Sequence, residues 1–360
     1  MDSINLRNAL NFYKGKKVLL TGHTGFKGSW LTLLLNKLGA EIRGYSLTPH
    51  TTPNHFDLIG IEKDIENTIG DIQDINKLSI VIKEFKPEIV FHLAAQAIVK
   101  KSYENPILTF NTNTIGTANL LEVIKESSSV KSLVCITSDK CYENYEWTWG
   151  YRENDILGGH DPYSASKAAA EIIFSSYQKS FFSNIRSIGV ATVRAGNVIG
   201  GGDWSDYRLI PDLIKAIQSN EPVKIRNPSS TRPWQHVLEP LSGYILLGAS
   251  LVRDPKFFSG AWNFGPSNLD ILSVEEVIKI IISKLGKGEM TIEDSKDNEH
   301  EANLLQLNCD KAIQNLSWKP RWTAIKALES TAEWFKVYLE GGNIRQKSEN
   351  QIDEYFKELK

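Results

Sequence analysis

Short apolar runs alternate with longer amphipathic segments through the first half of the chain. The apolar runs predict β-strands at residues 17–21, 41–47, 65–71, 89–94, 132–138 and 187–194. Apolar positions recur with the period of a helix at residues 28–38, 76–85, 112–126 and 164–181. This alternation predicts an α/β fold in which a parallel sheet carries helices on both faces. Right-handed crossovers then make the sheet doubly wound.

The pattern changes after residue 196. Short predicted strands at 223–226 and 262–264 mix there with predicted helices at 211–219, 241–251 and 274–285. We therefore expect a large domain over residues 1–196 and a smaller mixed C-terminal lobe over residues 197–360, with segments that can interleave between the two. The charged last stretch, residues 341–360, is expected to form a peripheral helix or a frayed end.

Charge and hydropathy narrow the class of protein. The 360 residues include 41 Lys and Arg against 43 Asp and Glu, which gives a net charge of −2. This balance offers no electrostatic basis for nucleic acid or an anionic membrane as a main partner. No apolar stretch approaches the roughly 20 residues that a membrane span needs, and the start of the chain lacks the apolar run of a signal peptide. We therefore expect a cytoplasmic protein without a membrane partner.

The cysteines point to the same compartment. Cys135, Cys141 and Cys309 form an odd and sparse set, which argues against a disulfide framework and fits a reducing cytoplasm. No paired Cys/His spacing typical of a metal site occurs, so we expect no metal.

A glycine-rich loop follows the first predicted strand and opens the first long helix. Gly22, Gly25 and Gly28 are spaced G-x-x-G-x-x-G. The first glycine permits a tight turn, the second lets the backbone approach a pyrophosphate, and the third lets helix and strand pack closely. This context predicts a Rossmann-like dinucleotide site, to which the intervening residues Thr24, Phe26 and Lys27 also contribute.

The choice between NAD and NADP stays open at this stage. An acidic residue for the ribose is expected at the end of the second strand, but residues 44–47 contain none. Arg43 could favour a 2′-phosphate, although it lies in the middle of the strand. At the end of the third strand, Asp71 and Ile72 are candidate adenine contacts, and a helix cap is the alternative for Asp71.

Tyr163 and Lys167 open the predicted helix at 164–181. Their spacing of four places them on one face, where an ammonium near a phenol lowers the phenol pKa. Tyr163 is therefore a candidate base near neutral pH, and Lys167 a candidate ligand of the nicotinamide ribose. The alternative is an ordinary surface pair.

Together these features resemble the extended short-chain dehydrogenase/reductase family, over nearly the whole chain. Further matching pieces are residues 93–96, Asn113 with residues 116–122, and residues 194–200. The resemblance implies that Leu93, Ala94 and Ala95 border the cofactor. It also implies that Gln96 and Asn113 lie at the substrate and that Asn197 binds the substrate's diphosphate.

A second set of motifs is more specific. Residues 22–30, 137–140, 226–228 and 231–237 resemble those of the CDP-glucose 4,6-dehydratases within that family. The resemblance implies CDP-glucose as substrate and NAD as a tightly bound cofactor that is regenerated in each turnover. It also implies that Ser138 hydrogen-bonds the sugar O4 and that Asp139 and Lys140 form a second acid/base pair, where the deoxythymidine-linked enzymes have Asp-Glu.

The reaction assigns roles to this pair. After oxidation at C4, a base must remove the C5 proton and an acid must protonate the departing 6-hydroxyl. We assign Lys140 as the base and Asp139 as the acid, and the reverse assignment stays open. The assignment requires a neutral lysine and a protonated aspartate, both against their reference states.

The substrate's diphosphate needs cations, and Arg232 is the first candidate because its planar fork suits phosphate oxygens. Arg208 is the second candidate, and we expect both in the smaller, substrate-binding lobe. The family further implies a homodimer formed through helices 113–126 and 164–181. The alternative hypotheses for the function are another sugar-nucleotide dehydratase, a 4-epimerase, or a non-catalytic dinucleotide-binding regulator.

Overall fold

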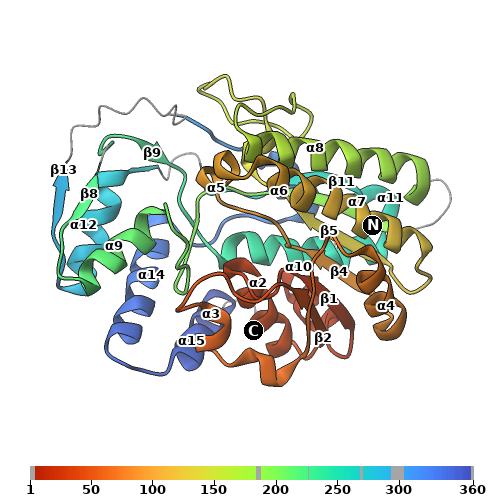
Figure 1. The fold of residues 1–360 in the computed structure, drawn as a ribbon, viewed down its shortest axis with the longest axis horizontal. Helices are drawn as coiled ribbons and strands as arrows, with labels where there is room; N and C mark the ends of the chain where they lie inside the picture. Colours follow the sequence, from red (N-terminus) through yellow and green to blue (C-terminus); the bar gives the residue numbers. More distant parts are fainter. Residues whose placement is uncertain (1–4, 184–187, 226, 268–270, 293–303, 358–360) are drawn as a thin grey trace.

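The chain folds around one seven-stranded sheet (Figure 1). The computed structural model describes residues 5–183, 188–225, 227–267, 271–292 and 304–357, so Arg226 and Ser187, the ends of two predicted strands, lie outside the described residues. The strand order is β11-β6-β5-β4-β1-β2-β3, and every neighbouring pair is parallel. The strands are β1 (Lys17–Thr21), β2 (Glu41–Ser46), β3 (Glu66–Ile69), β4 (Ile89–His92), β5 (Ser132–Ile136), β6 (Gly189–Arg194) and β11 (Gly260–Asn263).

Helices cover both faces of this sheet, because successive side chains of a buried strand point to opposite sides. Leu19 of β1 packs in a cluster with α4 (Ile75–Phe85), α7 (Gly116–Glu126) and α8 (Pro162–Tyr177). Its neighbours Val18 and Leu20 pack in the other cluster, with α2 (Phe26–Lys37) and α10 (Leu238–Arg253). The predicted doubly wound fold is confirmed.

The C-terminal half contributes to the large sheet as well as to the smaller lobe. The strand predicted at 262–264 is β11, which pairs with β6 and forms an edge of the large sheet. Helix α10 packs on the same sheet. Interleaving of segments is thus observed, while the division at residue 196 stays a prediction.

The remaining elements are short or belong to the smaller lobe. Three two-stranded pairs join β7 (Val198–Ile199) to β10 (Gln235–His236), β9 (Thr231–Arg232) to β12 (Leu272–Ser273), and β8 (Val223–Ile225) to β13 (Met290–Ile292). Further helices are α1 (Leu6–Phe12), α3 (His55–Leu58), α5 (Val99–Glu104), α6 (Pro106–Phe110), α9 (Leu209–Gln218), α11 (Pro255–Phe258), α12 (Val274–Leu285), α13 (Asp310–Leu316), α14 (Ala324–Leu339) and α15 (Ile344–Tyr355). π-Helical turns precede α7 and follow α8, at Asn111–Ile115 and Gln178–Phe182.

The last helix, α15, is part of the core. Its Tyr355 hydroxyl donates to the buried carboxylate of Glu239 at 2.7 Å. Its Ser348 hydroxyl lies 3.1 Å from Nε2 of His55, which in turn bonds Ser29 of α2. The alternative prediction of a frayed end is therefore wrong for residues 344–355. They form a helix that packs against α2 and α14 (Figure 1).

None of the helices in the described ranges is both long and apolar enough to cross a membrane. No group of three or more His, Cys, Asp or Glu side chains within these ranges is arranged to hold a metal ion.

Candidate active site

The carboxyl ends of β1, β4, β5 and β6 lie side by side and carry the predicted site residues. At the first two of these ends, Thr21 Oγ1 lies 2.7 Å from Nδ1 of His92 and accepts a hydrogen bond from the amide of Ala94 at 3.3 Å. Parallel α/β sheets bind their ligands at this edge. The geometry therefore places the glycine loop directly beside the segment that follows β4.

The glycine loop has the close contacts that only glycine allows. Gly22 has a φ of +74°, and a Cβ there would lie 2.5 Å from the amide nitrogen of Ala94. A Cβ at Gly28 would lie 2.0 Å from the carbonyl oxygen of Gly22. Helix α2 starts after Gly25 without a side-chain cap, so its first amides are available to a negatively charged group. These residues fit a dinucleotide pyrophosphate.

The side chain of Thr24 is used within the protein. Its hydroxyl donates to the carbonyl of Leu47 at 2.9 Å and lies 2.9 Å from the hydroxyl of Ser46. These bonds join the glycine loop to the end of β2. Arg43 is also engaged elsewhere: its guanidinium contacts Glu84 at 3.4 Å and Glu66 at 3.7 Å.

The segment after β3 shows whether Asp71 caps the following helix, the alternative to an adenine contact. Helix α4 is capped by Asp74, whose side chain accepts from the amide of Lys77 at 3.0 Å. Asp71 instead accepts from the amide of Gln73 at 2.9 Å and forms a turn. A helix cap at Asp71 is therefore wrong, and its neighbour Ile72 is buried against Gly116 of α7. The adenine contact stays a prediction.

The Ser138–Lys140 turn follows β5 and forms a 3₁₀-helix at Asp139–Cys141. Asp139 Oδ1 accepts from the Ser138 hydroxyl at 2.9 Å and from the amide of Lys140 at 3.0 Å. A Cβ at Gly196 would lie 1.8 Å from Asp139 Oδ2, so the carboxylate is packed against the backbone after β6. Ser138 and Asp139 are buried, whereas Lys140 is half-buried.

Tyr163 and Lys167 lie on the first turns of α8, which Asp161 caps by accepting from the amide of Ser164 at 2.9 Å. Both side chains are buried, at 7% and 5% exposure, so the surface-pair alternative is wrong. Helix α8 packs against the Ser138–Lys140 turn, and Ser138 acts to lower the pKa of the Tyr163 phenol.

The acidity of Tyr163 differs from our expectation. Burial raises the pKa of Tyr163 to about 12, although Ser138 and the charge of Arg208 oppose this rise. The lowered phenol pKa predicted from Lys167 is wrong here, because burial outweighs the favourable charges. Burial also lowers the pKa of Lys167, whose Nζ donates to the carbonyl of Ile136 at 3.5 Å.

Gln96 and Asn113 form an internal hydrogen-bond network. Asn113 Oδ1 accepts from the Gln96 amide at 2.8 Å, and its Nδ2 donates to Ser166 at 2.9 Å. The Gln96 side chain donates to Thr109 and accepts from the amide of Ile98. The geometry therefore shows both residues fixing the loop after β4 against α8, and their contact with substrate stays a prediction.

The two arginines predicted to bind the diphosphate, Arg208 and Arg232, lie in different parts of the structure. Arg208, before α9, pairs with Asp203 at 2.8 Å, and its charge acts on Tyr163 and on Lys27 of the glycine loop. Burial lowers the pKa of Lys27 to about 8, and Arg208 adds to this effect. Arg232 lies in the small lobe on β9, where its Nη1 donates to the carbonyl of Thr231. The charge of Arg208 thus acts on two of the predicted site residues, Tyr163 and Lys27.

Asn197 follows β6 in the left-handed region, with a φ of +49°. Its carbonyl accepts from the amide of Gln235, which holds the β7–β10 pair beside the catalytic turn. A small pocket lies between these segments; its lining includes Asp139, Gly196, Gln235, Pro266 and Leu307. Asp139 is thus the residue of the Ser138–Lys140 turn that lines this pocket.

Sequence reasoning missed two acidic residues. Asp203 is buried and holds Arg208. Glu171 lies at the same spacing of four after Lys167 that Lys167 has after Tyr163, so all three share one face of α8. That spacing was the available signal for Glu171, whereas nothing local in the sequence identified Asp203.

The fold and the site define a class of protein: a dinucleotide-binding enzyme of the short-chain dehydrogenase/reductase type, with a buried tyrosine and lysine at the carboxyl edge of the sheet. A family model described as GDP-mannose 4,6 dehydratase matches residues 19–331. The chain belongs to this family, within the extended short-chain dehydrogenases/reductases.

Two curated relatives show how the similarity is distributed. The chain is 48% identical over 349 residues to CDP-glucose 4,6-dehydratase from Salmonella typhimurium, which covers 96% of this chain and 97% of that protein. It is 24% identical to CDP-paratose 2-epimerase from Salmonella typhi, over 88% of this chain and 98% of that protein.

Solved structures share the fold. An epimerase from Methanothermobacter thermautotrophicus has a TM-score of 0.78 and 26% identity, covering 95% of this chain and 97% of its own. dTDP-glucose 4,6-dehydratase from Bacillus anthracis, solved in complex with NAD, has a TM-score of 0.74 and 24% identity, covering 96% and 100%.

Proposed function

We propose that this chain converts CDP-glucose to CDP-4-keto-6-deoxyglucose with a tightly bound NAD that is regenerated in each turnover. The observation that carries the proposal is the buried contact between Tyr163 and the Ser138–Lys140 turn, in a chain 48% identical over 96% of its length to a CDP-glucose 4,6-dehydratase. An epimerase has no use for a second acid/base pair at this turn. A non-catalytic regulator would have no use for a buried Tyr163 and Lys167.

The first step is oxidation at C4. Tyr163 takes the proton of the sugar O4, and Ser138 hydrogen-bonds the same oxygen. A bound NAD would supply the hydride acceptor for C4 and, after its reduction, the hydride donor for C6. Lys167 holds the nicotinamide ribose, and the hydrogen bonding of Ser138 together with the positive charge of Arg208 acts against the burial that raises the Tyr163 pKa.

The second step is elimination of water across C5 and C6. The 4-ketone acidifies the C5 hydrogen, Lys140 removes it as a base, and Asp139 protonates the departing 6-hydroxyl. When hydride is returned to C6, Lys140 gives the proton back to C5, which completes the 4-keto-6-deoxy product. The packing of Asp139 against Gly196 and its bond with Ser138 hold this carboxyl beside the O4 site. Arg208, Arg232 and Asn197 bind the diphosphate of the substrate.

Two observations support NAD rather than NADP. Arg43, the basic residue on β2 that could meet a 2′-phosphate, is paired with Glu66 and Glu84. At the end of the same strand, Ser46 and the carbonyl of Leu47 are bonded to Thr24, so this end presents no cation. A solved dehydratase with the same fold contains NAD.

A panel of nucleotide sugars tests the proposal. The protein, incubated separately with the glucose conjugates of CDP, dTDP, GDP and UDP, is expected to yield a 4-keto product that absorbs in alkali from CDP-glucose alone. No net NADH should accumulate, because the hydride returns to the sugar. An equal yield from another conjugate, or epimerised product without loss of water, would contradict the proposal.

We also propose a homodimer in the reducing cytoplasm. The three cysteines are buried free thiols. Large apolar side chains are exposed on the neighbouring helical elements α5, α6, Asn111–Ile115 and α8; they are Tyr103, Ile107, Leu108, Ile115 and Ile172. A second copy of the chain would cover this face by an isologous contact.

The expected mass by light scattering at micromolar concentration is twice that of one chain. Changing Ile115 and Ile172 together to glutamate should give the monomer mass with an unchanged circular dichroism spectrum, because both side chains are exposed in the single chain, at 50% and 59%. A monomer mass for the unmodified protein, or a dimer that survives the double change, would count against this face.

A further inference from the structure

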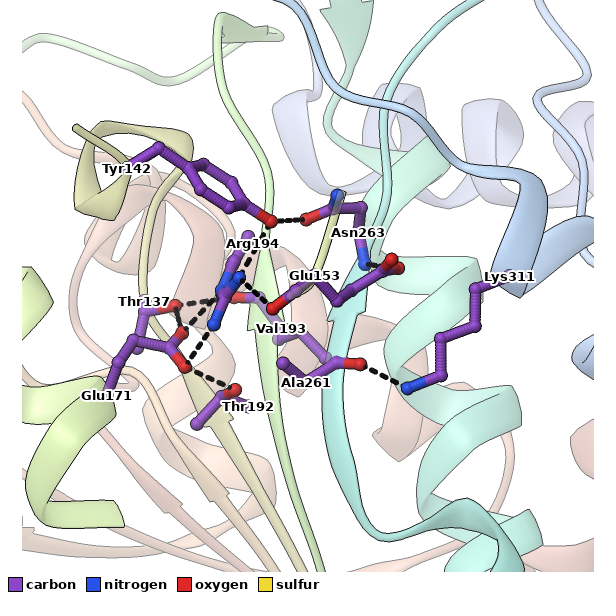
Figure 2. Close-up of polar contacts among 10 residues, drawn as sticks. All are labelled: Thr137, Tyr142, Glu153, Glu171, Thr192, Val193, Arg194, Ala261, Asn263 and Lys311. Atoms are coloured by element: carbon purple, nitrogen blue, oxygen red, sulfur yellow. Dashed lines mark hydrogen bonds and ion pairs between the residues drawn. The ribbon is translucent and has the colours of Figure 1, made fainter. Parts of the chain in front are cut away.

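A buried ion pair lies directly beneath the catalytic turn (Figure 2). Arg194, the last residue of β6, donates from Nη2 and Nε to the two carboxylate oxygens of Glu171, at 2.8 and 3.0 Å. Both side chains are only 3% exposed. Burial alone would raise the pKa of Glu171, yet Arg194 and the hydroxyls around it hold that pKa below its ordinary value. The pair is therefore charged, and both carboxylate oxygens of Glu171 accept hydrogen bonds.

The pair contacts both ends of the Ser138–Lys140 turn. On one side, Glu171 accepts a hydrogen bond from the hydroxyl of Thr137, the residue before Ser138, at 2.5 Å. On the other side, Arg194 Nη1 donates at 2.7 Å to the hydroxyl of Tyr142, two residues after Lys140. The guanidinium also lies 4.7 Å from the centre of the Tyr142 ring.

The network continues away from the turn through Tyr142. Its hydroxyl donates to Asn263 Oδ1 at 2.8 Å (Figure 2). The Asn263 side chain donates in turn to the carbonyls of Tyr151 and Asn308. The turn is thereby tied to β11, to the segment between the turn and α8 that contains Tyr151, and to the C-terminal loop that contains Asn308, in addition to α8.

We infer that the Glu171–Arg194 pair is a positioning element of the catalytic centre: it fixes the Ser138–Lys140 turn at both ends and keeps a negative charge beside Lys167. The inference rests on the proposed function, and it deepens that function by adding residues that act through the catalytic ones. Glu171 and Arg194 do not touch the reacting atoms, so they are positioning residues.

The charge of Glu171 reaches Lys167 one helical turn away. Burial lowers the pKa of Lys167, while Cys135, Glu171 and Cys141 act in the opposite direction. The charge of this ammonium also acts on Lys27 and His92, and the phenol of Tyr163 shares its face of α8. Removing the negative charge of Glu171 would leave the Arg194 cation uncompensated near Lys167, so the Lys167 pKa would fall further.

Glu171→Gln tests both parts of the inference, since glutamine keeps the size of the side chain and removes its charge. A turn displaced by about 1 Å costs roughly 10²-fold in rate, so kcat is expected to fall by about that factor. The KM for CDP-glucose should stay near its original value, because the pair is buried beneath the turn. The alkaline limb of the pH–kcat profile, where Lys167 loses its proton, should move to lower pH.

Tyr142→Phe separates positioning from charge. It removes the hydroxyl between Arg194 and Asn263 but keeps the ring and every charge, so kcat should fall while the alkaline limb stays in place. Glu239→Gln is the matched control for loss of a buried carboxylate, because Glu239 bonds Tyr355 and the amide of Trp322 in the C-terminal segment. Its kcat and pH profile are expected to be those of the unmodified protein.

The outcomes are distinguishable from failure of the proposed function. If the unmodified protein makes no 4-keto product from CDP-glucose, the function is wrong. If it does, the inference is overturned by a folded Glu171→Gln variant with unchanged kcat and pH profile, or by the same alkaline shift in Glu239→Gln. Should Glu171→Gln not fold, normal kcat in Tyr142→Phe would overturn the inference by itself.

Discussion

Replacing Tyr163 by phenylalanine is expected to lower kcat by roughly 10²- to 10⁴-fold, the usual value of a positioned general base. The hydroxyl is the only group lost, and the buried ring keeps its packing at the start of α8. Tyr177→Phe on the same helix is the matched control, since its hydroxyl donates to Glu122 away from the site. Single-turnover reduction of the bound cofactor measures the step, and near-normal reduction in Tyr163→Phe would show that another residue is the base.

The pH dependence of that step has a definite sign. The pKa of Tyr163 lies at about 12 because the phenol is buried, so the phenolate fraction increases as pH rises through the neutral range. Oxidation at C4 should therefore accelerate with increasing pH until another group that the step requires in its protonated form loses its proton. In Tyr163→Phe the remaining rate should lack this increase.

Replacing Lys140 by alanine is expected to give the second large effect, again roughly 10²- to 10⁴-fold in overall turnover. The variant should still oxidise C4 but stall before elimination, because no base removes the C5 proton. Reduced cofactor and a 4-keto-hexose should then accumulate on the enzyme, and solvent deuterium should not enter C5. Mass spectrometry of the released sugar nucleotide measures this exchange.

Two further variants assign the roles within the pair. Lys140→Arg keeps the positive charge but cannot supply a neutral base, so it should fail as alanine does. Asp139→Asn removes the acid and leaves the base, so elimination should stop while some exchange at C5 survives. Normal C5 exchange in Lys140→Ala would show that Lys140 is not the base.

The sheet and the glycine loop could be predicted because their signals are local. A buried parallel strand is a continuous apolar run, and residues 17–21 and 132–136 are of this kind. The loop from Gly22 to Gly28 needs glycine for contacts with its own neighbours in sequence and with Ala94. Strand β11 shows the limit, since a short run such as 260–263 does not reveal which sheet it joins.

The site could be predicted only in part, because charge balance is set by contacts between distant residues. Tyr163 and Lys167 were found from their spacing, but the Tyr163 pKa depends on burial that no local pattern displays. The pairing of Arg208 with Asp203, and of Arg43 with Glu84, follows from the folded arrangement. Asn113 was expected at the substrate, and its side-chain bonds to Gln96 and to Ser166 of α8 became visible only in the structure.

The central claim is that hydride leaves C4 and returns to C6 of the same sugar. CDP-glucose carrying deuterium at C4 tests it most directly, with the product analysed by mass spectrometry and NMR. The account predicts that the deuterium appears at C6 of a 4-keto-6-deoxy product and that the cofactor is oxidised again at the end of each turnover. Deuterium lost to solvent, retained at C4, or recovered in free reduced cofactor would contradict it.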